Sequence, residues 1–563
     1  MEALSRSEIL VYNTLDWLMT TSPHRDSYPL YFTIVAALFL LVVNLGYLNL
    51  ALHATPDFVY TGANPYAASD KLVYMSMVQQ GREGLLFMKN LHTVEPQIGS
   101  MLSPHWFLIG QTANLFSLSN NAAYQIYRVV FIILFLWLLY ALLNRLFTTT
   151  FDKIFAALFV LFSGGLGWYV FMKNPLIVQT ANTSLKFFYF PTDTYITEGN
   201  TLLNFAQSPL FSASQLLLIL IVYVFIRYRD DESLWYDFIN AALFAVLVVM
   251  HPYNLPIILT VLGSWTVWYF VRTRDPLIFK KYLVLLCGGL IALAFNIFIV
   301  WSEPVLAEWL KQNLVFSPLF SRYLWGYGLL MPLAAIGLYA VWKTRRDHPW
   351  WVMLAIWSVL AWVLLYLPLN VNRRFINGLH IVLALMAYAG FSYLMTFIHH
   401  AWLRKIYVLT IALIIFSHLG FYVFINGYFS NGVYTYGYYY LTADEQQVIA
   451  YLDRYSQRGA RLLTSDKMTS FTLTGQLDRL VFRGHDHQTP QSHLKEQQLE
   501  WFFADQAAPH ALERKEAFLQ DEKIEFVIVN HTRQKVPVLW IDEAEFLEPV
   551  FANPTFSVYR VSG

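Results

Sequence analysis

Apolar runs long enough to cross a bilayer recur from Tyr31 almost to Tyr428. A membrane-spanning helix needs about 20 such residues, and hydropathy places about eleven of these helices in the chain. The composition agrees, because 57% of the residues are hydrophobic and only 13% are charged. We therefore predict a polytopic α-helical membrane protein. The expected spans are residues 30–53, 121–144, 153–172, 209–227, 234–250, 255–271, 282–302, 322–342, 350–368, 375–397 and 405–428.

Basic residues fall in alternate connections between these spans. They are Arg145, Lys153, Arg227, Arg229, Arg272, Arg274, Lys280, Lys281, Lys343, Arg345, Arg346, Arg404 and Lys405. Because basic loops stay on the cytoplasmic side, residues 1–29 are predicted to be cytoplasmic and the C-terminus extracytoplasmic. The run from Tyr31 is too long for a cleavable signal and should anchor the chain in the plasma (inner) membrane. Ile9 to Met19 fit a short amphipathic helix on the inner surface.

Three outer segments are too long to be simple connectors. Two of them, residues 54–120 and 173–209, interrupt a transmembrane domain predicted over residues 30–430. The third, residues 431–563, is predicted to be an extracytoplasmic α/β domain, because about 120 residues can bury a core of their own. Its expected helices are Ala443–Ser456, Gln491–Phe503 and Glu513–Asp521, and its expected strands are Arg461–Thr464, Arg479–Phe482, Ile524–Val529 and the edge strand Phe556–Val561.

Arg373 and Arg374 lie at an outward helix end, where neither membrane insertion nor the preference of basic residues for cytoplasmic loops explains them. A planar guanidinium donates two hydrogen bonds at once, which suits a phosphate group. Basic side chains at such a depth can also simply reach lipid headgroups. Two adjacent arginines after an Asn-rich turn exceed what an anchor needs, so we predict that they bind a phosphate.

Asp70 begins a helical pattern in the first outer loop, with Leu72, Met75 and Val78 on the apolar face until Gly81. Asp70 is therefore expected near a helix start, close to the membrane surface. A carboxylate there commonly stabilises the helix by about 1 kcal/mol, so its position alone assigns no function.

The same loop carries a series of short motifs, namely Asp70, Tyr74, Gln80-Gly81-Arg82-Glu83-Gly84, Lys89-Asn90-Leu91-His92-Thr93-Val94-Glu95-Pro96 and Ser103-Pro104-His105-Trp106. Together they resemble the first external loop of bacterial GT-C glycosyltransferases, in the branch related to protein O-mannosyltransferases and lipid A- or lipopolysaccharide-modifying transferases. The resemblance covers the general plan from Tyr31 to about Tyr428. It implies a GT-C-like fold and makes Asp70 the acidic residue that this family carries at the membrane surface. It also likens Arg373 and Arg374 to basic residues used near the lipid phosphate.

Glu198 and His251 fit the same plan. Glu198 lies in the second outer loop just ahead of a helix, and His251 lies at a hairpin tip on the same predicted side. We expect both to contact substrate, although a histidine at a wet helix end is more often a cap or an interface residue. Asp193-Thr194-Tyr195 lacks the second acid of an Asp-x-Asp motif. We therefore predict no cofactor and no bound metal, with Asp193 and Glu198 as a weak divalent site at most.

The tail holds one polar cluster, Gly484-His485-Asp486-His487-Gln488-Thr489-Pro490. Its histidines and Asp486 could form part of a metal site, but no third ligand at regular spacing is apparent. A strand-to-helix loop rich in capping groups explains the composition as well.

The predicted activity is glycosyl transfer from a polyprenyl-phosphate sugar to a hydroxyl of an unidentified glycan, lipid or protein outside the cytoplasm. Asp70 would be the general base, the arginines would stabilise the departing phosphate, and Glu198 would contact sugar or acceptor. A net charge of +1 does not indicate that the protein binds nucleic acid. The single cysteine, Cys287, excludes an intramolecular disulfide.

Two other classes of protein stay open. A flippase for lipid-linked saccharides, or another transporter, should carry ionisable residues in mid-span, interrupted helices or paired repeats. A scaffold that presents the tail would leave the acids of the outer loops scattered in space.

Overall fold

A computed structural model describes residues 27–64, 68–173, 190–430, 437–504, 510–533 and 538–562. The predicted amphipathic helix Ile9–Met19 and residues 174–189 of the second outer loop lie outside the described residues. The chain divides into two compact units, which are considered separately. Unit 1 comprises residues up to 45, 128–291 and 315–425, and unit 2 comprises residues 46–127, 292–314 and 426 onwards.

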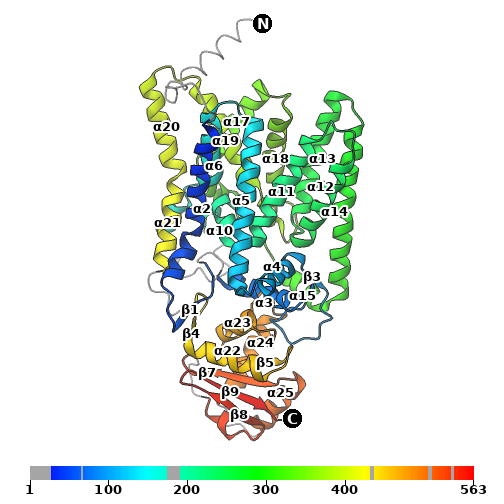
Figure 1. The fold of residues 1–563 in the computed structure, drawn as a ribbon, viewed down its shortest axis with the longest axis vertical. Helices are drawn as coiled ribbons and strands as arrows, with labels where there is room; N and C mark the ends of the chain where they lie inside the picture. Colours follow the sequence, from blue (N-terminus) through cyan, green and yellow to red (C-terminus); the bar gives the residue numbers. More distant parts are fainter. Residues whose placement is uncertain are drawn as a thin grey trace. The chain divides into compact units, whose positions relative to one another are not determined.

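The apolar helices belong wholly or mostly to unit 1, and Figure 1 shows α5, α18 and α13 running roughly parallel to one another. They are α2 (Tyr28–Leu52), α5 (Asn120–Leu146), α6 (Thr150–Phe162), α7 (Gly167–Lys173), α11 (Pro209–Arg227), α12 (Trp235–Met250), α13 (Asn254–Thr273), α14 (Leu277–Ser302), α16 (Phe320–Tyr327), α17 (Leu330–Thr344), α18 (Pro349–Leu365), α19 (Leu379–Met395), α20 (Ala401–Ile415) and α21 (Ser417–Ser430). Each apolar run predicted as a span is therefore largely helical.

Among the described residues, eight helical segments are long and apolar enough to cross a membrane. The pair α16 and α17, bent by 87°, would make a ninth, whereas α12 and α18 are shorter apolar helices. The prediction of a polytopic helical membrane protein is confirmed. The count of about eleven spans stays a prediction.

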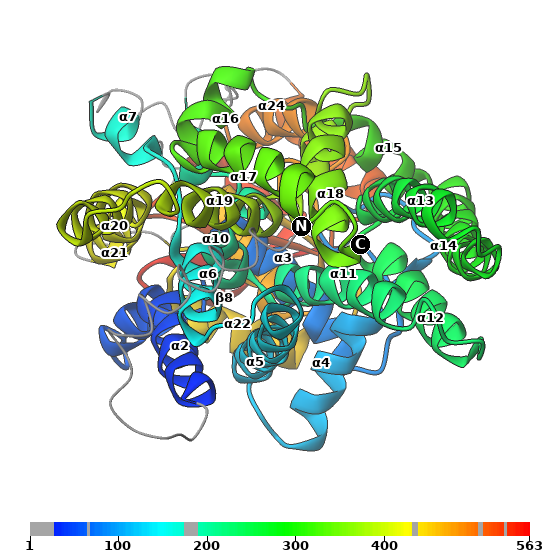
Figure 2. The same ribbon diagram turned by 90° about the horizontal axis from the view of Figure 1, so that it is seen from above.

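Glycines bring α17 and α19 into close contact, and Figure 2 shows these two helices side by side. A Cβ on Gly337 would lie 1.9 Å from the carbonyl oxygen of Met386, and one on Gly390 would lie 2.0 Å from that of Leu333. Only glycine fits at such backbone approaches, which gain dispersion energy that helices in lipid cannot obtain from the hydrophobic effect. The close packing of α17 and α19 supports the segment that precedes α19.

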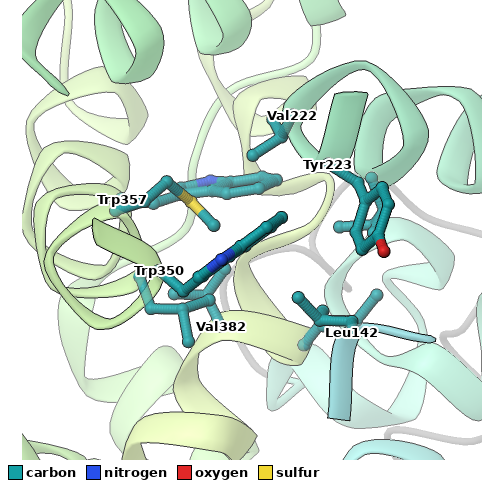
Figure 3. A pocket seen from close by; sticks show the side chains of 10 residues that line it. Leu142, Val222, Tyr223, Trp350, Trp357 and Val382 are labelled. Carbon is teal, nitrogen blue, oxygen red and sulfur yellow. The ribbon is translucent and has the colours of Figure 1, made fainter. Parts of the chain in front are cut away.

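A small cavity lies between α5, α11, α18 and α19 (Figure 3). Its labelled lining is Leu142, Val222, Tyr223, Trp350, Trp357 and Val382. Apart from the Tyr223 hydroxyl and the indole nitrogens, these side chains are apolar, and none of the predicted site residues is among them. The cavity is a gap in helix packing and offers no groups that would bind a phosphate or a sugar.

Short elements of unit 1 connect the helices at the predicted outer side. They are η1 (Thr192–Thr194), η2 (Thr197–Gly199), α10 (Thr201–Gln207) and η3 (Asn372–Ile376). Asn200 caps α10, because its side chain accepts hydrogen bonds from the backbone N–H groups of Leu202 and Leu203. The cap determines where α10 begins, shortly after Glu198, and so helps to position that acid.

The C-terminal part of unit 2 contains a five-stranded mixed sheet in the order β6-β5-β7-β9-β8, of which Figure 1 shows β7, β9 and β8 together. The strands are β5 (Arg461–Thr464), β6 (Leu480–Val481), β7 (Phe526–Asn530), β8 (Leu547–Ala552) and β9 (Phe556–Val561), and the helices are α22 (Ala443–Tyr455), α23 (Lys467–Gln476), α24 (Ser492–Phe503) and α25 (Ala511–Asp521). The prediction of a C-terminal α/β domain is confirmed.

One strand assignment is wrong. Phe556–Val561 forms β9 as predicted, but it is not an edge strand, because it pairs with β7 on one side and with β8 on the other. β8 escaped prediction because Glu548 and Pro549 interrupt its apolar pattern, and proline is tolerated there only because β8 is the true edge.

The first outer loop folds with the tail in unit 2. Its elements are β1 (Phe58–Tyr60), α3 (Ala68–Arg82), β2 (Phe87–Met88), β3 (Met101–Leu102) and α4 (Pro104–Leu115), and α15 (Pro304–Gln312) joins them. β1 pairs with β4 (Tyr440–Thr442), and α3 packs against α23, where Gly475 lies close to Leu72. The predicted boundary between the transmembrane domain and the tail stays a prediction.

Candidate functional site

Glu198 and Arg374 form an ion pair between η2 and η3, in which Arg374 Nη1 donates to Glu198 Oε1. Glu198 is 4% exposed and Arg374 is 23% exposed. Thr197 Oγ1 donates to the other carboxylate oxygen at 3.1 Å. Gly199 allows the two elements to approach, since a Cβ there would lie 2.9 Å from Cδ1 of Ile376. Two residues that were predicted from separate parts of the chain therefore meet.

The backbone around Arg373 is held by a second segment of unit 1. The Arg373 N–H donates to the carbonyl oxygen of Val315 at 3.2 Å, and the Val315 N–H donates to that of Asn370 at 2.7 Å. The Ser317 N–H donates to Asn372 Oδ1 at 2.7 Å. These bonds fix the turn that carries both arginines.

Aromatic rings lie beside both guanidinium groups. The Arg373 guanidinium carbon lies 5.9 Å from the centroid of Tyr195, and that of Arg374 lies 5.7 Å from the centroid of Tyr253. A cation over a ring face gains about 0.5–2 kcal/mol, more when it is shielded from water. Burial raises the pKa of Tyr195 to about 12, although Arg373 and Arg322 oppose this shift, so its phenol stays neutral.

His251 lies in a buried amide network at the tip between α12 and α13. Asn254 Nδ2 donates to His251 Nδ1 and to Ser214 Oγ, both at 2.9 Å, and Asn377 Nδ2 donates to Asn254 Oδ1 at 2.8 Å. An Nδ1 that accepts a hydrogen bond leaves the proton of the neutral ring on Nε2. His251 is therefore a neutral side chain whose orientation the network determines.

Tyr253 links His251 to the ion pair, because its ring centroid lies 5.3 Å from that of His251 and 5.7 Å from the Arg374 guanidinium carbon. Burial would raise the pKa of Glu198, but the guanidinium groups of Arg374 and Arg373 outweigh it and lower this pKa to about 2. Burial, followed by the charge of Arg374, lowers the pKa of His251 to about 4, although Glu198 opposes this. At neutral pH the cluster therefore holds one carboxylate, two guanidinium groups and an uncharged imidazole.

Asp70 lies in unit 2, in the first turn of α3 as predicted. Its side chain is 42% exposed, and its Oδ1 lies 3.5 Å from Nε2 of His485 in the tail. The structure thus brings Glu198, His251, Arg373 and Arg374 together in unit 1. That Asp70 shares a site with them stays a prediction.

Asp193 does not join the cluster as a metal ligand. Its Oδ2 accepts the N–H groups of Gly165 at 3.2 Å and Gly167 at 3.3 Å, and lies 3.3 Å from Nδ1 of His418. Across the described ranges, no three His, Cys, Asp or Glu side chains are arranged to hold a metal ion. Glu198 is bound by Arg374 and Thr197, and Oδ2 of Asp193 by Gly165 and Gly167, so the two acids have different partners.

The fold has clear counterparts among solved structures. The oligosaccharyltransferase of Archaeoglobus fulgidus in its apo form superposes with a TM-score of 0.55 at 12% identity, over 89% of this chain and 69% of that chain. The chain has a GT-C-like fold. The same oligosaccharyltransferase, AglB, matches with a TM-score of 0.52 in complex with an inhibitory peptide and a dolichol-phosphate, at the same identity and coverage. Its complex with Zn and sulfate matches with a TM-score of 0.50 at 12% identity, over 94% and 73% of the two chains. No protein-family model matches the chain, and neither does any curated protein.

Several residues of the cluster were not predicted. Tyr195 lies in the segment Asp193-Thr194-Tyr195 and Tyr253 lies close to His251 in the sequence, so their pairing with arginines could have been suspected from the preference of guanidinium groups for aromatic faces. Arg322 lies on α16, in a segment that reads as an ordinary span, and carried no signal. The contact of His485 with Asp70 joins residues so far apart in sequence that no local pattern reveals it.

Proposed function

We propose that the protein is an integral-membrane glycosyltransferase that moves a sugar from a polyprenyl-phosphate donor to an acceptor hydroxyl outside the cytoplasm. The observation that carries this proposal is the pair of adjacent guanidinium groups on tyrosine rings, beside a buried carboxylate, in a GT-C-like fold. AglB, which shares this fold, has been solved with dolichol-phosphate. Eight or more apolar helices support a location in the membrane.

The arginines suit the phosphate of the donor. Two adjacent guanidinium groups present several N–H donors in fixed planes, and a phosphate diester offers oxygens that accept them in pairs. The ion pair with Glu198 holds Arg374 in place, and the Arg373 guanidinium lies beside it over the ring of Tyr195. Both charges would stabilise the negative charge that develops on the phosphate as it leaves.

Asp70 is suited to proton transfer. We propose that its carboxylate takes the proton of the acceptor hydroxyl while the hydroxyl oxygen forms a bond to the anomeric carbon. The bond between that carbon and the phosphate oxygen breaks, and its electron pair leaves with the polyprenyl phosphate. The proton then passes from Asp70 to water, to which 42% of the side chain is open.

The topology proposed from the basic loops places the C-terminal tail outside the cytoplasm, on the side of the acceptor. A reporter that is active only outside the cytoplasm should work when fused after Gly563 and fail when fused after Arg346. An active fusion after Arg346 would reverse the proposed orientation.

Transport of a lipid-linked saccharide is the second candidate function. The observation that favours it is His418, a buried ionisable side chain of the predicted span 405–428 that contacts Asp193 of the second outer loop, because ionisable side chains within spans often line a transport path. The break between α6 and α7, near Gly165 and Gly167, is also typical of transporters.

One assay separates the two functions. The purified protein is placed in liposomes with a panel of undecaprenyl-phosphate hexoses and pentoses, with and without acceptor hydroxyl compounds, and the release of undecaprenyl phosphate is measured. A transferase should release undecaprenyl phosphate from at least one donor. A transporter should move the intact lipid-linked sugar between leaflets without cleaving it, and that result would overturn the proposed activity.

A further inference from the structure

The polar loop of the tail lies against the proposed base. His485 follows β6, and its Nε2 lies 3.5 Å from Oδ1 of Asp70, which belongs to the first turn of α3. Both residues lie in unit 2. The His485 side chain is only 11% exposed, whereas that of Asp70 is 42% exposed. A buried histidine of the tail thus faces a carboxylate that stays open to an incoming group.

The backbone determines which ring nitrogen faces Asp70. The N–H of His487 donates to Nδ1 of His485 at 3.2 Å. A ring nitrogen that accepts a hydrogen bond carries no proton, so the neutral imidazole of His485 has its proton on Nε2. The Nε2–H group is therefore the one directed at the carboxylate. The separation of 3.5 Å is slightly longer than a hydrogen bond, as is common for catalytic pairs before substrate binds.

Hydrogen bonds to the first outer loop hold the loop that carries His485. Thr489 Oγ1 donates to the carbonyl oxygen of His92 at 2.7 Å and accepts the N–H of Gly484 at 3.0 Å. Asn90 Nδ2 donates to the carbonyl oxygen of Gln488 at 2.7 Å. A Cβ on Gly484 would lie 2.4 Å from Nδ1 of His92, so this position requires glycine. The packing leaves His485 little freedom to turn away from Asp70.

Charged groups next to the pair are already engaged. Asp486 pairs with Lys467 and with Arg483 on either side of the loop. Lys71, which follows Asp70 in α3, lies 3.2 Å from the ring centroid of Tyr124 and donates to Asn121. His92 is buried, and burial lowers its pKa to about 3, so it stays neutral. His485 is thus a titratable group of the tail that faces the Asp70 carboxylate at 3.5 Å.

We propose that His485 is a positioning residue for Asp70, which it orients through Nε2–H, so that the tail completes the proposed general base. This role rests on the proposed function, in which Asp70 accepts the proton of the acceptor hydroxyl. A hydrogen-bond donor beside a carboxylate favours the charged form of the carboxylate. It also restricts the rotation of the side chain, so that the carboxylate is directed toward the acceptor.

The experiment compares H485L, H485Q, H493L and D70N in the release of undecaprenyl phosphate by the full-length protein. Leucine removes the donor, whereas the Gln amide can still reach Asp70. We expect H485L to lower kcat roughly tenfold with little change in KM, as for loss of one hydrogen bond to a charged group. The acidic limb of its pH profile for kcat/KM should move to higher pH. H485Q should recover most of kcat, and H493L, which changes an exposed histidine of α24, should behave as wild type.

The outcomes separate two kinds of failure. If wild type releases no undecaprenyl phosphate from any donor, the proposed function fails and the role of His485 falls with it. If wild type is active and D70N is inactive, but H485L matches H493L in kcat and in pH profile, the role of His485 alone is overturned. If H485L fails to fold, the kcat of H485Q is compared with that of H485N, because the longer Gln amide can reach Asp70 and the shorter Asn amide cannot. Equal kcat in those two variants would contradict the proposal.

Discussion

Glu198 in unit 1 and Asp70 in unit 2 are both acids of predicted outer loops, but their surroundings differ. Glu198 is 4% exposed and bound to Arg374, which together with Arg373 lowers its pKa to about 2. Asp70 is 42% exposed and faces the imidazole of His485 in place of a guanidinium. A carboxylate with so low a pKa as that of Glu198 is a poor proton acceptor at neutral pH. Burial and partners therefore support the proposed division, in which Glu198 holds Arg374 and Asp70 accepts the proton.

The largest effect is expected from D70N. The amide keeps the shape of the side chain but cannot take a proton, so kcat should fall by about 10² to 10⁴, the contribution of a positioned general base. Rates of undecaprenyl phosphate release, with folding checked by size-exclusion chromatography, provide the measurement. D57N, at an exposed aspartate of the same loop, is the control and should be unaffected. If D70N turns over at a rate close to that of wild type, Asp70 acts only as a helix cap.

E198Q should act on stability more than on the chemical step. Removing the carboxylate leaves the mostly buried Arg374 without its countercharge, which should cost about 3 kcal/mol of unfolding free energy, the low end for a broken buried pair. Thermal unfolding in detergent measures this loss. E308Q breaks the exposed pair with Lys311 and should cost no more than about 1 kcal/mol. Equal shifts for the two variants would show that the buried pair is not a structural support.

The arginines should differ from each other. R373K keeps the charge but loses the planar fork and the tyrosine contact, so binding of undecaprenyl phosphate should weaken about tenfold. R374K should weaken it less, because the charge of Arg374 is already engaged by Glu198. R346K, at an exposed arginine, should bind as wild type does. Identical affinities for all of these variants would refute the phosphate-binding role.

The smallest effect concerns pH. His251 has a folded pKa of about 4, below its ordinary value of 6.5, so the unfolded chain takes up its proton first as pH falls. The stability that the neutral ring contributes is complete above pH 6.5 and is lost as pH falls to about 4. Glu198 loses its contribution only between pH 4.5 and about 2. H251Q should flatten the dependence of the unfolding midpoint on pH between 6.5 and 4, and an unchanged slope would contradict this assignment.

Local patterns predicted the helices and most of the tail, because apolar run length and residue spacing report directly on spans and strands. β5 spans Arg461–Thr464 as expected, whereas β8 was missed where Pro549 breaks the pattern. Pairing across the chain could not be predicted in the same way. The contact of Glu198 with Arg374 depends on η2 and η3 meeting, and that of His485 with Asp70 depends on the tail folding onto the first loop. Neither packing arrangement leaves a periodic trace in the sequence.

The central claim is that the adjacent guanidinium groups of Arg373 and Arg374 bind the phosphate of a polyprenyl-phosphate donor. An experimental structure with bound undecaprenyl phosphate tests it most directly. We predict that the phosphate contacts both Arg373 and Arg374. A phosphate bound away from both arginines would contradict the account.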